Sequence, residues 1–142
     1  MFLGEAEHSL DAKGRVILPA KYRDQLAGGA YLVKGRGGCL FIYTPEEFEA
    51  VAETVREQSR RGETELQAAR TFFAGAEQIA PDKQGRVAIP ALLRTYAGLD
   101  REVVVAGVFS RIEIWDRRRW RERDQHGDES LTQSSNLPEF GI

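Results

Sequence analysis

Two short basic motifs contain the residues of this sequence that are most able to do chemistry. Each places an aspartate, a lysine, a glycine and an arginine within five positions: Asp11, Lys13, Gly14 and Arg15 in the first copy, and Asp82, Lys83, Gly85 and Arg86 in the second. Lysine and arginine beside a glycine turn can bind phosphate, and arginine can also hydrogen-bond a guanine edge with two donors. The pattern therefore indicates a duplicated turn that serves structure, binding, or both.

The arginines have two open interpretations. In the first, Arg15 pairs with Asp11 across its turn, and the second copy repeats this pair. In the second, Arg15 faces a nucleic acid together with Lys13, which would lie on the same face of an extended chain about 7 Å away. The two are compatible, because a carboxylate can orient a guanidinium that still faces a phosphate.

The aspartates do not indicate an enzyme. Each lies before a glycine and an arginine, where an aspartate commonly accepts hydrogen bonds from turn amides. The sequence has no Ser-His-Asp order, no nucleophile elbow and no glycine loop followed by Lys-Ser, and the glycine-rich stretch 35–38 is better explained as a hairpin turn. Two histidines and the single Cys39 are too few for a tetrahedral zinc site. We therefore predict no catalytic residue, no metal and no cofactor.

Length and composition indicate an intracellular globular protein. The 142 residues suffice for one ordinary domain or two very small ones. A single cysteine is typical of a reducing compartment, no apolar run approaches the roughly 20 residues of a membrane span, and the first residues lack the basic region of a signal peptide. The formal net charge of −2 argues against nucleic-acid binding, but residues 13–36 hold six basic residues and one acid. A basic face can therefore form on an acidic protein.

The two motifs belong to an internal duplication. They are 71 residues apart, half the chain, and matching residues recur at this offset on both sides. The further matches are Phe2/Phe73, Gly4/Gly75, Val16/Val87, Pro19/Pro90, Ala20/Ala91 and Arg23/Arg94. We expect a first repeat with its helices over residues 1–71, a second over residues 72–124, and a flexible tail over residues 125–142.

Each repeat is predicted to contain short strands followed by helices. Extended segments are expected at 2–10, 15–18, 30–34 and 39–43, and again at 73–81, 86–89, 102–106 and 111–115. Helices are expected at 20–26, from the Thr44 cap to Gly62, from a Thr64 cap onward, at 91–97, and from Arg117 to about Asp124. A lone repeat would have a marginal core. We therefore predict an α+β, mainly β fold in which strands of one repeat complete the sheet of the other.

A basic run, Arg117-Arg-Arg-Trp-Arg-Glu-Arg123, opens the last helix. Its arginines would surround the helix axis, with Trp120 pointing inward. The simpler interpretation is a solvated helix face whose arginine stems cover apolar surface. A phosphate contact or an ion pair between subunits is the alternative.

Together these features resemble the MraZ family, bacterial regulators associated with the cell-division and cell-wall gene cluster. The resemblance lies in the two Asp-x-x-x-Arg motifs, their aliphatic-proline strand ends and the opening Met1–Glu5, and it extends to about residue 124. It implies two AbrB-like swapped-hairpin repeats joined into one pseudo-two-fold, double-psi-like β-barrel. It also implies a ring of about eight subunits that binds short direct repeats of double-stranded DNA upstream of its own operon and represses it.

The resemblance also assigns roles by position. The DNA-contacting residues would be Lys13, Arg15, Lys83 and Arg86. The residues that orient the arginines and shape the turns would be Asp11, Asp82, Gly14 and Gly85. Because Gln84 stands where the first motif has a lysine, we expect the second turn to contribute less. No membrane or small-molecule partner is implied, and the expected location is the cytoplasm, on the nucleoid.

Two other functions are alternatives. AbrB-like halves also occur in antitoxins, which join DNA binding to neutralising a toxin, but these usually have one such half and a disordered arm. The present chain has two halves and a short tail. The other alternative is a barrel enzyme or small-ligand binder that would use Asp11 and Asp82, and the lack of a catalytic arrangement disfavours it.

Overall fold

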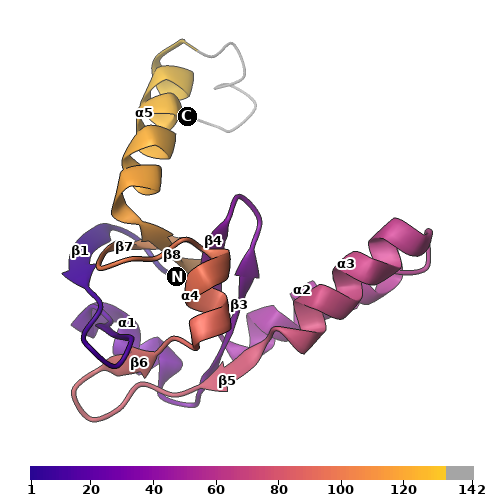
Figure 1. Cartoon of the computed structure of the whole chain (residues 1–142), viewed down its shortest axis with the longest axis horizontal. Helices are drawn as coiled ribbons and strands as arrows, with labels where there is room; N and C mark the ends of the chain where they lie inside the picture. Colours follow the sequence, from indigo (N-terminus) through magenta and orange to yellow (C-terminus); the bar gives the residue numbers. More distant parts are fainter. Residues whose placement is uncertain (134–142) are drawn as a thin grey trace.

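Short strands and helices alternate along the chain, and the structure, a computed structural model, describes residues 1–133 (Figure 1). The strands are β1 (Glu5–Ser9), β2 (Arg15–Ile17), β3 (Ala30–Gly35), β4 (Cys39–Tyr43), β5 (Glu77–Ile79), β6 (Arg86–Ala88), β7 (Glu102–Val108) and β8 (Arg111–Asp116). The helices are α1 (Ala20–Arg23), continued by a 3-10 turn (Asp24–Leu26), α2 (Pro45–Gln58), α3 (Glu63–Ala74), α4 (Ala91–Tyr96) and α5 (Arg117–Gln133). The elements follow the predicted order in both halves.

Strands from the two halves are interleaved. The six-stranded antiparallel sheet has the order β1-β7-β8-β4-β3-β5, and β2 pairs with β6 in a separate two-stranded ribbon. The first strand of each half therefore pairs with a strand of the other half, β1 with β7 and β5 with β3. Exchanging the halves leaves the strand order unchanged. The fold is α+β and mainly β, as the sequence predicts.

One large apolar core joins the sheet to the ribbon. Val16 and Val87 contribute from the ribbon, while Leu32, Ile42 and other alternate strand residues contribute from the sheet. Period-two alternation sends these side chains to one face of their strands. The short helices α1 and α4 follow the ribbon strands and add further apolar residues such as Leu93. The position of the ribbon is thus fixed by the side chains that it buries.

A second, smaller apolar cluster covers the other face of the sheet. Phe41 and Trp115 belong to it, and Phe48 of α2 and Trp120 of α5 pack against it. Strand β4 is buried along its whole length, which explains why its sequence is continuously apolar rather than alternating. Burial raises the pKa of the Cys39 thiol to about 12. Cys39 is therefore a small buried side chain and an unreactive one.

Two helical arms extend from this body in different directions (Figure 1). The α2–α3 hairpin forms one arm, and the distal part of α5 forms the other. The Thr44 hydroxyl accepts a hydrogen bond from the Glu47 amide at 3.3 Å, with Pro45 in the first turn, so the predicted cap of α2 is confirmed. The Asp116 carboxylate caps α5 by accepting from the Arg119 amide at 3.2 Å.

The boundaries of α3 differ from the prediction. Gly62 precedes its first residue directly, so Thr64 lies inside the helix and does not cap it. At the other end the helix includes Phe73, which the sequence placed in an extended segment, and ends at Ala74 with Gly75 as its C-cap. The neighbouring Phe72 packs against the second apolar cluster from the helix. Tertiary packing has here overridden the β-propensity of the aromatic pair.

Helix α5 is longer than predicted. It continues to Gln133 instead of ending near Asp124, so residues 125–133 of the expected tail are helical. The tail was predicted from the Gly-, Ser- and Gln-rich composition that begins at His126, but one glycine costs a helix only about 1 kcal/mol, and glutamine is a good helix former. The rest of the expected tail, residues 134–142, lies outside the described residues. None of the helices within residues 1–133 has the length and apolar character needed to cross a membrane.

Candidate nucleic-acid interface

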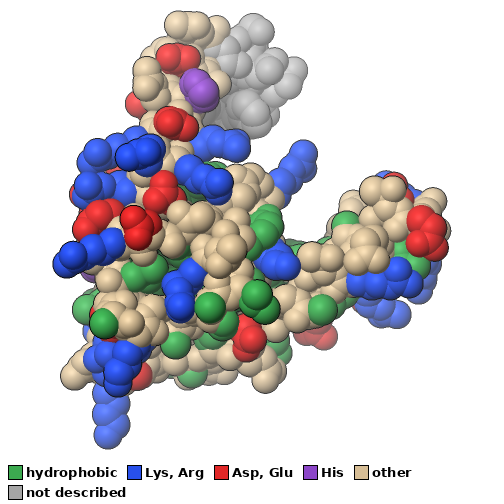
Figure 2. Space-filling model, in the orientation of Figure 1, with side chains coloured by type: hydrophobic (Ala, Val, Ile, Leu, Met, Phe, Trp, Pro, Cys, Tyr) green, Lys and Arg blue, Asp and Glu red, His purple; other side chains and the backbone are tan. Residues whose placement is uncertain are grey.

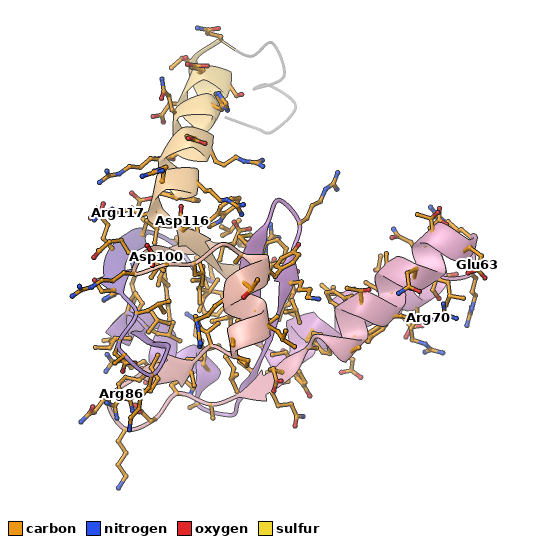
Figure 3. All side chains as sticks on the ribbon, in the orientation of Figure 1. Glu63, Arg70, Arg86, Asp100, Asp116 and Arg117 are labelled. Atoms are coloured by element: carbon orange, nitrogen blue, oxygen red, sulfur yellow. The ribbon has the colours of Figure 1, made fainter. Side chains whose placement is uncertain are left out.

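The β2–β6 ribbon carries both predicted arginines on one outward face. Its register pairs Arg15 with Ala88, Val16 with Val87, and Ile17 with Arg86. The middle pair is buried, so the outer pairs point away from the core. Arg15 and Arg86 are then diagonal neighbours, which in antiparallel strands are roughly 7–8 Å apart. Figure 3 labels Arg86 at this edge of the molecule, and Figure 2 places several Lys and Arg side chains there.

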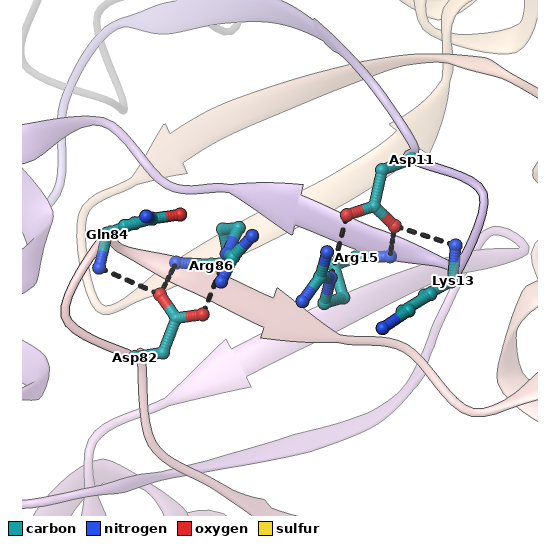
Figure 4. Close-up of polar contacts among 6 residues, drawn as sticks. All are labelled: Asp11, Lys13, Arg15, Asp82, Gln84 and Arg86. Carbon is teal, nitrogen blue, oxygen red and sulfur yellow. Dashed lines mark hydrogen bonds and ion pairs between the residues drawn. The ribbon is translucent and has the colours of Figure 1, made fainter.

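The first turn is organised around the carboxylate of Asp11 (Figure 4). One carboxylate oxygen accepts hydrogen bonds from the backbone amides of Lys13 and Arg15, at 2.9 and 3.0 Å. The other accepts from Nε of Arg15 at 2.7 Å. Gly14 completes the turn with a φ of 75°, which a glycine adopts without strain. A single side chain therefore closes the turn and aims the arginine.

The second turn repeats this geometry. The Asp82 carboxylate accepts from the amides of Gln84 and Arg86, both at 2.9 Å, and from Nε of Arg86 at 2.7 Å (Figure 4). Gly85 has a φ of 78°. The carboxylate contacts only the backbone at position 84, so glutamine there leaves the turn intact. The change from lysine to glutamine alters what the turn presents to a partner and does not alter its shape.

Both arginines keep donors for an external partner. Within residues 1–133 the hydrogen bonds of the Arg15 side chain involve only Nε, and the same is true of Arg86. The terminal nitrogens, which form the outer edge of the guanidinium, remain able to donate. The two side chains are 28% and 29% exposed, so they are held in place but accessible. The two interpretations of these arginines are thus structurally compatible: the ion pairs form and leave a free binding edge.

Hydrogen bonds lower the pKa values of both aspartates. For Asp11 the backbone N–H of Arg15 is the largest cause, and its guanidinium adds to the effect; Asp82 and Arg86 behave alike. Because the pKa is lowered in the folded chain, the ionised carboxylate stabilises the turn above its ordinary pKa of 3.8, and this is lost as the pH falls through the lowered value. Among residues 1–133, carboxylates, histidines and the cysteine form no group of three that could hold a metal ion.

The lysines do not lie as an extended chain would place them. Lys13 is in the turn, and β2 begins only at Arg15, so the expected 7 Å spacing along one strand face was wrong. Gly14 bends the chain between them. Lys13 and Lys83 are both exposed, but they occupy different positions of their turns, since Lys83 corresponds to Ala12. Positive charge therefore flanks the ribbon on both sides without being symmetric.

Sequence reasoning missed two arginines that contact the turns. Arg23 donates through Nε to the carbonyl oxygen of Leu18 at 3.1 Å, and Arg94 donates to the carbonyl of Ile89. Their guanidinium groups lie against the turn glycines. The signal was present, because Arg23 and Arg94 match at the same offset as the motifs. This match could not be interpreted from the sequence, because the sequence does not show which turn each arginine contacts.

The basic run at the start of α5 is largely paired within the chain. Arg117 forms ion pairs with Glu7 and Glu102, at 3.4 and 3.5 Å, and Arg121 pairs with Glu7 at 3.3 Å. The guanidinium of Arg123 lies 5.7 Å from the Trp115 ring. Figure 2 shows positive and negative side chains intermixed around the base of this helix. These contacts favour the solvated helix face over a phosphate-binding site.

A family model described as "MraZ protein, putative antitoxin-like" matches residues 1–70 and 72–136. A protein of Salinispora arenicola called transcriptional regulator MraZ is 50% identical over 120 residues, covering 84% of each chain. Proteins of the same name from Paenarthrobacter aurescens and Frankia alni are each 44% identical, covering 99% of both chains in the first case, and 95% of this chain and 94% of the relative in the second.

Replacing Arg15 with glutamine tests what lowers the pKa of Asp11. The backbone N–H, which is the largest cause, remains in the variant, so we expect the pKa to rise but to stay below 3.8. Carbon-13 NMR titration of the carboxyl group measures it, and Asp82 in the same sample is the control that should not move. A pKa of 3.8 or above in the variant would show that the guanidinium, and not the turn, holds the carboxylate ionised.

Proposed function

Because the chain belongs to the MraZ family, we propose that it is a sequence-specific DNA-binding transcriptional regulator whose β2–β6 ribbon reads the major groove. It represses its own division and cell-wall operon by binding short direct repeats upstream, in the cytoplasm and on the nucleoid. The name carried by its relatives supports the regulatory role. No cofactor and no catalytic step are part of this proposal.

The observation that carries the proposal is the outward face of the ribbon. A two-stranded antiparallel ribbon fits the width of the major groove. Arg15 and Arg86 lie on the same face, each with one edge fixed by a carboxylate and the other free to donate. A pre-aimed arginine can bond the O6 and N7 atoms of guanine in the major groove with little loss of side-chain entropy. Ile17, 43% exposed on this face, suits contact with a thymine methyl group.

The flanking lysines supply the sequence-independent part of the affinity. Lys13 and Lys83 are exposed in the two turns, beyond the ends of the ribbon strands, where phosphates pass on either side of the groove. Asp11 and Asp82 orient the arginines, and Gly14 and Gly85 give the turns their shape. Each turn therefore holds one lysine, but Lys83 stands at the position of Ala12. Where the first turn has Lys13 the second has the uncharged Gln84, and we expect the second turn to bind more weakly for that reason.

A ring of about eight subunits completes the proposal and answers the unfavourable net charge of −2. Each chain offers few phosphate contacts, but several ribbons on successive DNA repeats add their contributions. Within each chain, residues 1–71 and 72–124 form the two AbrB-like repeats, which close into one pseudo-two-fold barrel. The interleaved strand order supports that arrangement.

Surfaces at opposite ends of the sheet support a head-to-tail assembly. Strands β4 and β8 are antiparallel and each begins at its hairpin turn, so the two turns point in opposite directions. Beside one turn lies a groove of about 820 Å³ between the α2–α3 hairpin and the β3–β4 turn, lined by Ala68, Phe72 and Tyr96 among others. At the other turn Phe109 is 67% exposed, with Leu3 close by. An apolar projection and an apolar groove at opposite ends suit a heterologous contact, which generates a ring when the rotation between neighbouring subunits closes.

An antitoxin-like interaction module is the second candidate, favoured by the description of the matching family. It would use the same apolar groove to hold a partner protein. Co-purification of a small protein in equal amounts, lost when Phe72 in the groove is replaced by serine, would support it.

Replacing Arg15 with alanine should weaken binding to the upstream DNA by about 1–3 kcal/mol for each contact made, and by more across a ring. Fluorescence anisotropy against the chain's own upstream DNA and a shuffled sequence measures the specific part. Arg60→Ala, an exposed arginine in the turn between α2 and α3, is the matched control and should bind as the original does. Equal affinity of the Arg15 variant, with the fold intact, would contradict the role given to the ribbon.

Replacing Phe109 with aspartate should shift the assembly toward smaller species. The residue has a φ of 54°, which aspartate tolerates better than phenylalanine, so the hairpin itself should form normally. Native mass spectrometry measures the change. Leu131→Asp, an exposed apolar residue on the distal part of α5, is the control. An unchanged mass distribution, or an equal loss in both variants, would overturn the role of the hairpin end.

A further inference from the structure

We propose that Arg23 and Arg94 are positioning residues that hold the DNA-facing turns in a crossed arrangement, each arginine bracing the turn of the opposite half. Arg94, in the second half, braces the first turn, and Arg23, in the first half, braces the second. The consequence for DNA binding rests on the function proposed above. The brace itself is a property of the folded chain and can be tested without DNA.

The first turn is held by two groups of the second half. The backbone N–H of Ile89 donates to the carbonyl oxygen of Gly14 at 2.9 Å. The guanidinium of Arg94 lies directly against Gly14, so close that a Cβ at this position would overlap it. Arg94 is itself fixed, because Nη1 donates to the carbonyl of Ile89. Backbone and side chain of the second half thus clasp the same glycine.

The second turn is held in the mirrored way by the first half. The N–H of Leu18 donates to the carbonyl oxygen of Gly85 at 2.9 Å. The guanidinium of Arg23 lies against Gly85, and its Nε donates to the carbonyl of Leu18 at 3.1 Å. Each arginine therefore belongs to one half by its backbone and its anchoring hydrogen bond, and to the other by the glycine that it covers.

This arrangement explains why both turn glycines are buried although their turns lie at the surface. Positive φ alone would admit an asparagine at some cost. A side chain at either glycine would also have to displace the guanidinium that lies against it. Since Gly14 lies directly before Arg15, its position controls where β2 begins and hence where the Arg15 guanidinium is aimed. Loss of this contact should make the orientation of the Arg15 guanidinium less well defined, without removing any residue of the DNA-facing surface.

A double-mutant cycle tests the crossing. Arg94→Met keeps an unbranched apolar stem and removes the guanidinium. We expect Arg94→Met to weaken specific DNA binding about tenfold. The same substitution should reduce the affinity little further when Arg15 is already alanine, and should reduce it by the full tenfold when Arg86 is alanine. Arg23→Met should give the opposite pattern. Coupling to the arginine of the same half, or full additivity in both pairs, would overturn the crossed brace.

Amide hydrogen exchange, measured by NMR in the absence of DNA, is a second and independent test of the crossed brace. In Arg94→Met we expect faster exchange at the amides of Lys13 and Gly14, and unchanged exchange at Gln84 and Gly85, with the reverse in Arg23→Met. A general destabilisation would speed both turns alike and would refute the proposal. If the original protein binds no DNA but the crossed exchange pattern is found, the proposed function fails and the brace stands.

Lysine variants guard against loss of the fold. Arg94→Lys keeps the positive charge and the ability to donate to a carbonyl, but not the planar group that covers the glycine. It should fold normally and show the same crossed pattern to a smaller degree. Exchange in Arg94→Lys that matches the original at every turn amide would mean that charge alone, and not coverage of the glycine, acts at this position.

Discussion

The pairing of β2 with β6 is the constraint on which the rest of the structure depends. Each strand has three residues, and one of them, Val16 or Val87, is buried in the core. Period-two alternation then forces both flanking residues outward, so the arginines face solvent because the valines do not. A slip of one residue would bury charge and expose valine, which a shared core does not tolerate. The candidate binding face is therefore specified by packing on its reverse side.

Charge is used locally and not through an overall basic surface. The Asp11 carboxylate reduces the net charge of the turn, which weakens any general attraction to DNA, but it fixes the Arg15 guanidinium in one orientation. A fixed guanidinium loses less entropy on forming two hydrogen bonds than a free one. Such a site is better suited to recognising the hydrogen-bonding pattern of a base than to binding DNA tightly through its overall charge. Its limited attraction for phosphate is also why the proposed function needs several subunits acting together.

Local features were predictable from the sequence, and long-range pairings were not. Asp11 and Gly14 fixed the turn, and Thr44 with Pro45 fixed the start of α2, because each signal acts within a few residues. The idea that halves share strands followed from their small size, but the partners of β1 and β5 needed the structure. The contact of Arg94 with Gly14 spans half the chain, and no spacing rule reports it. The extent of α5 was missed because a Gly-, Ser- and Gln-rich composition is typical of a tail but does not exclude a helix.

The differences between the two turns bear on the kind of DNA site that the ribbon suits. The backbones agree in every hydrogen bond made by the aspartates, while the outward side chains differ: Ile17 corresponds to Ala88, and Lys13 to Gln84. A perfectly two-fold face would present the same groups to both strands of DNA and would suit a palindrome. A face with one stronger and one weaker half has a direction. Direct repeats also have a direction, so subunits that all face the same way around a ring can bind each repeat in the same orientation. A two-fold face has no direction and would not distinguish direct repeats from inverted ones.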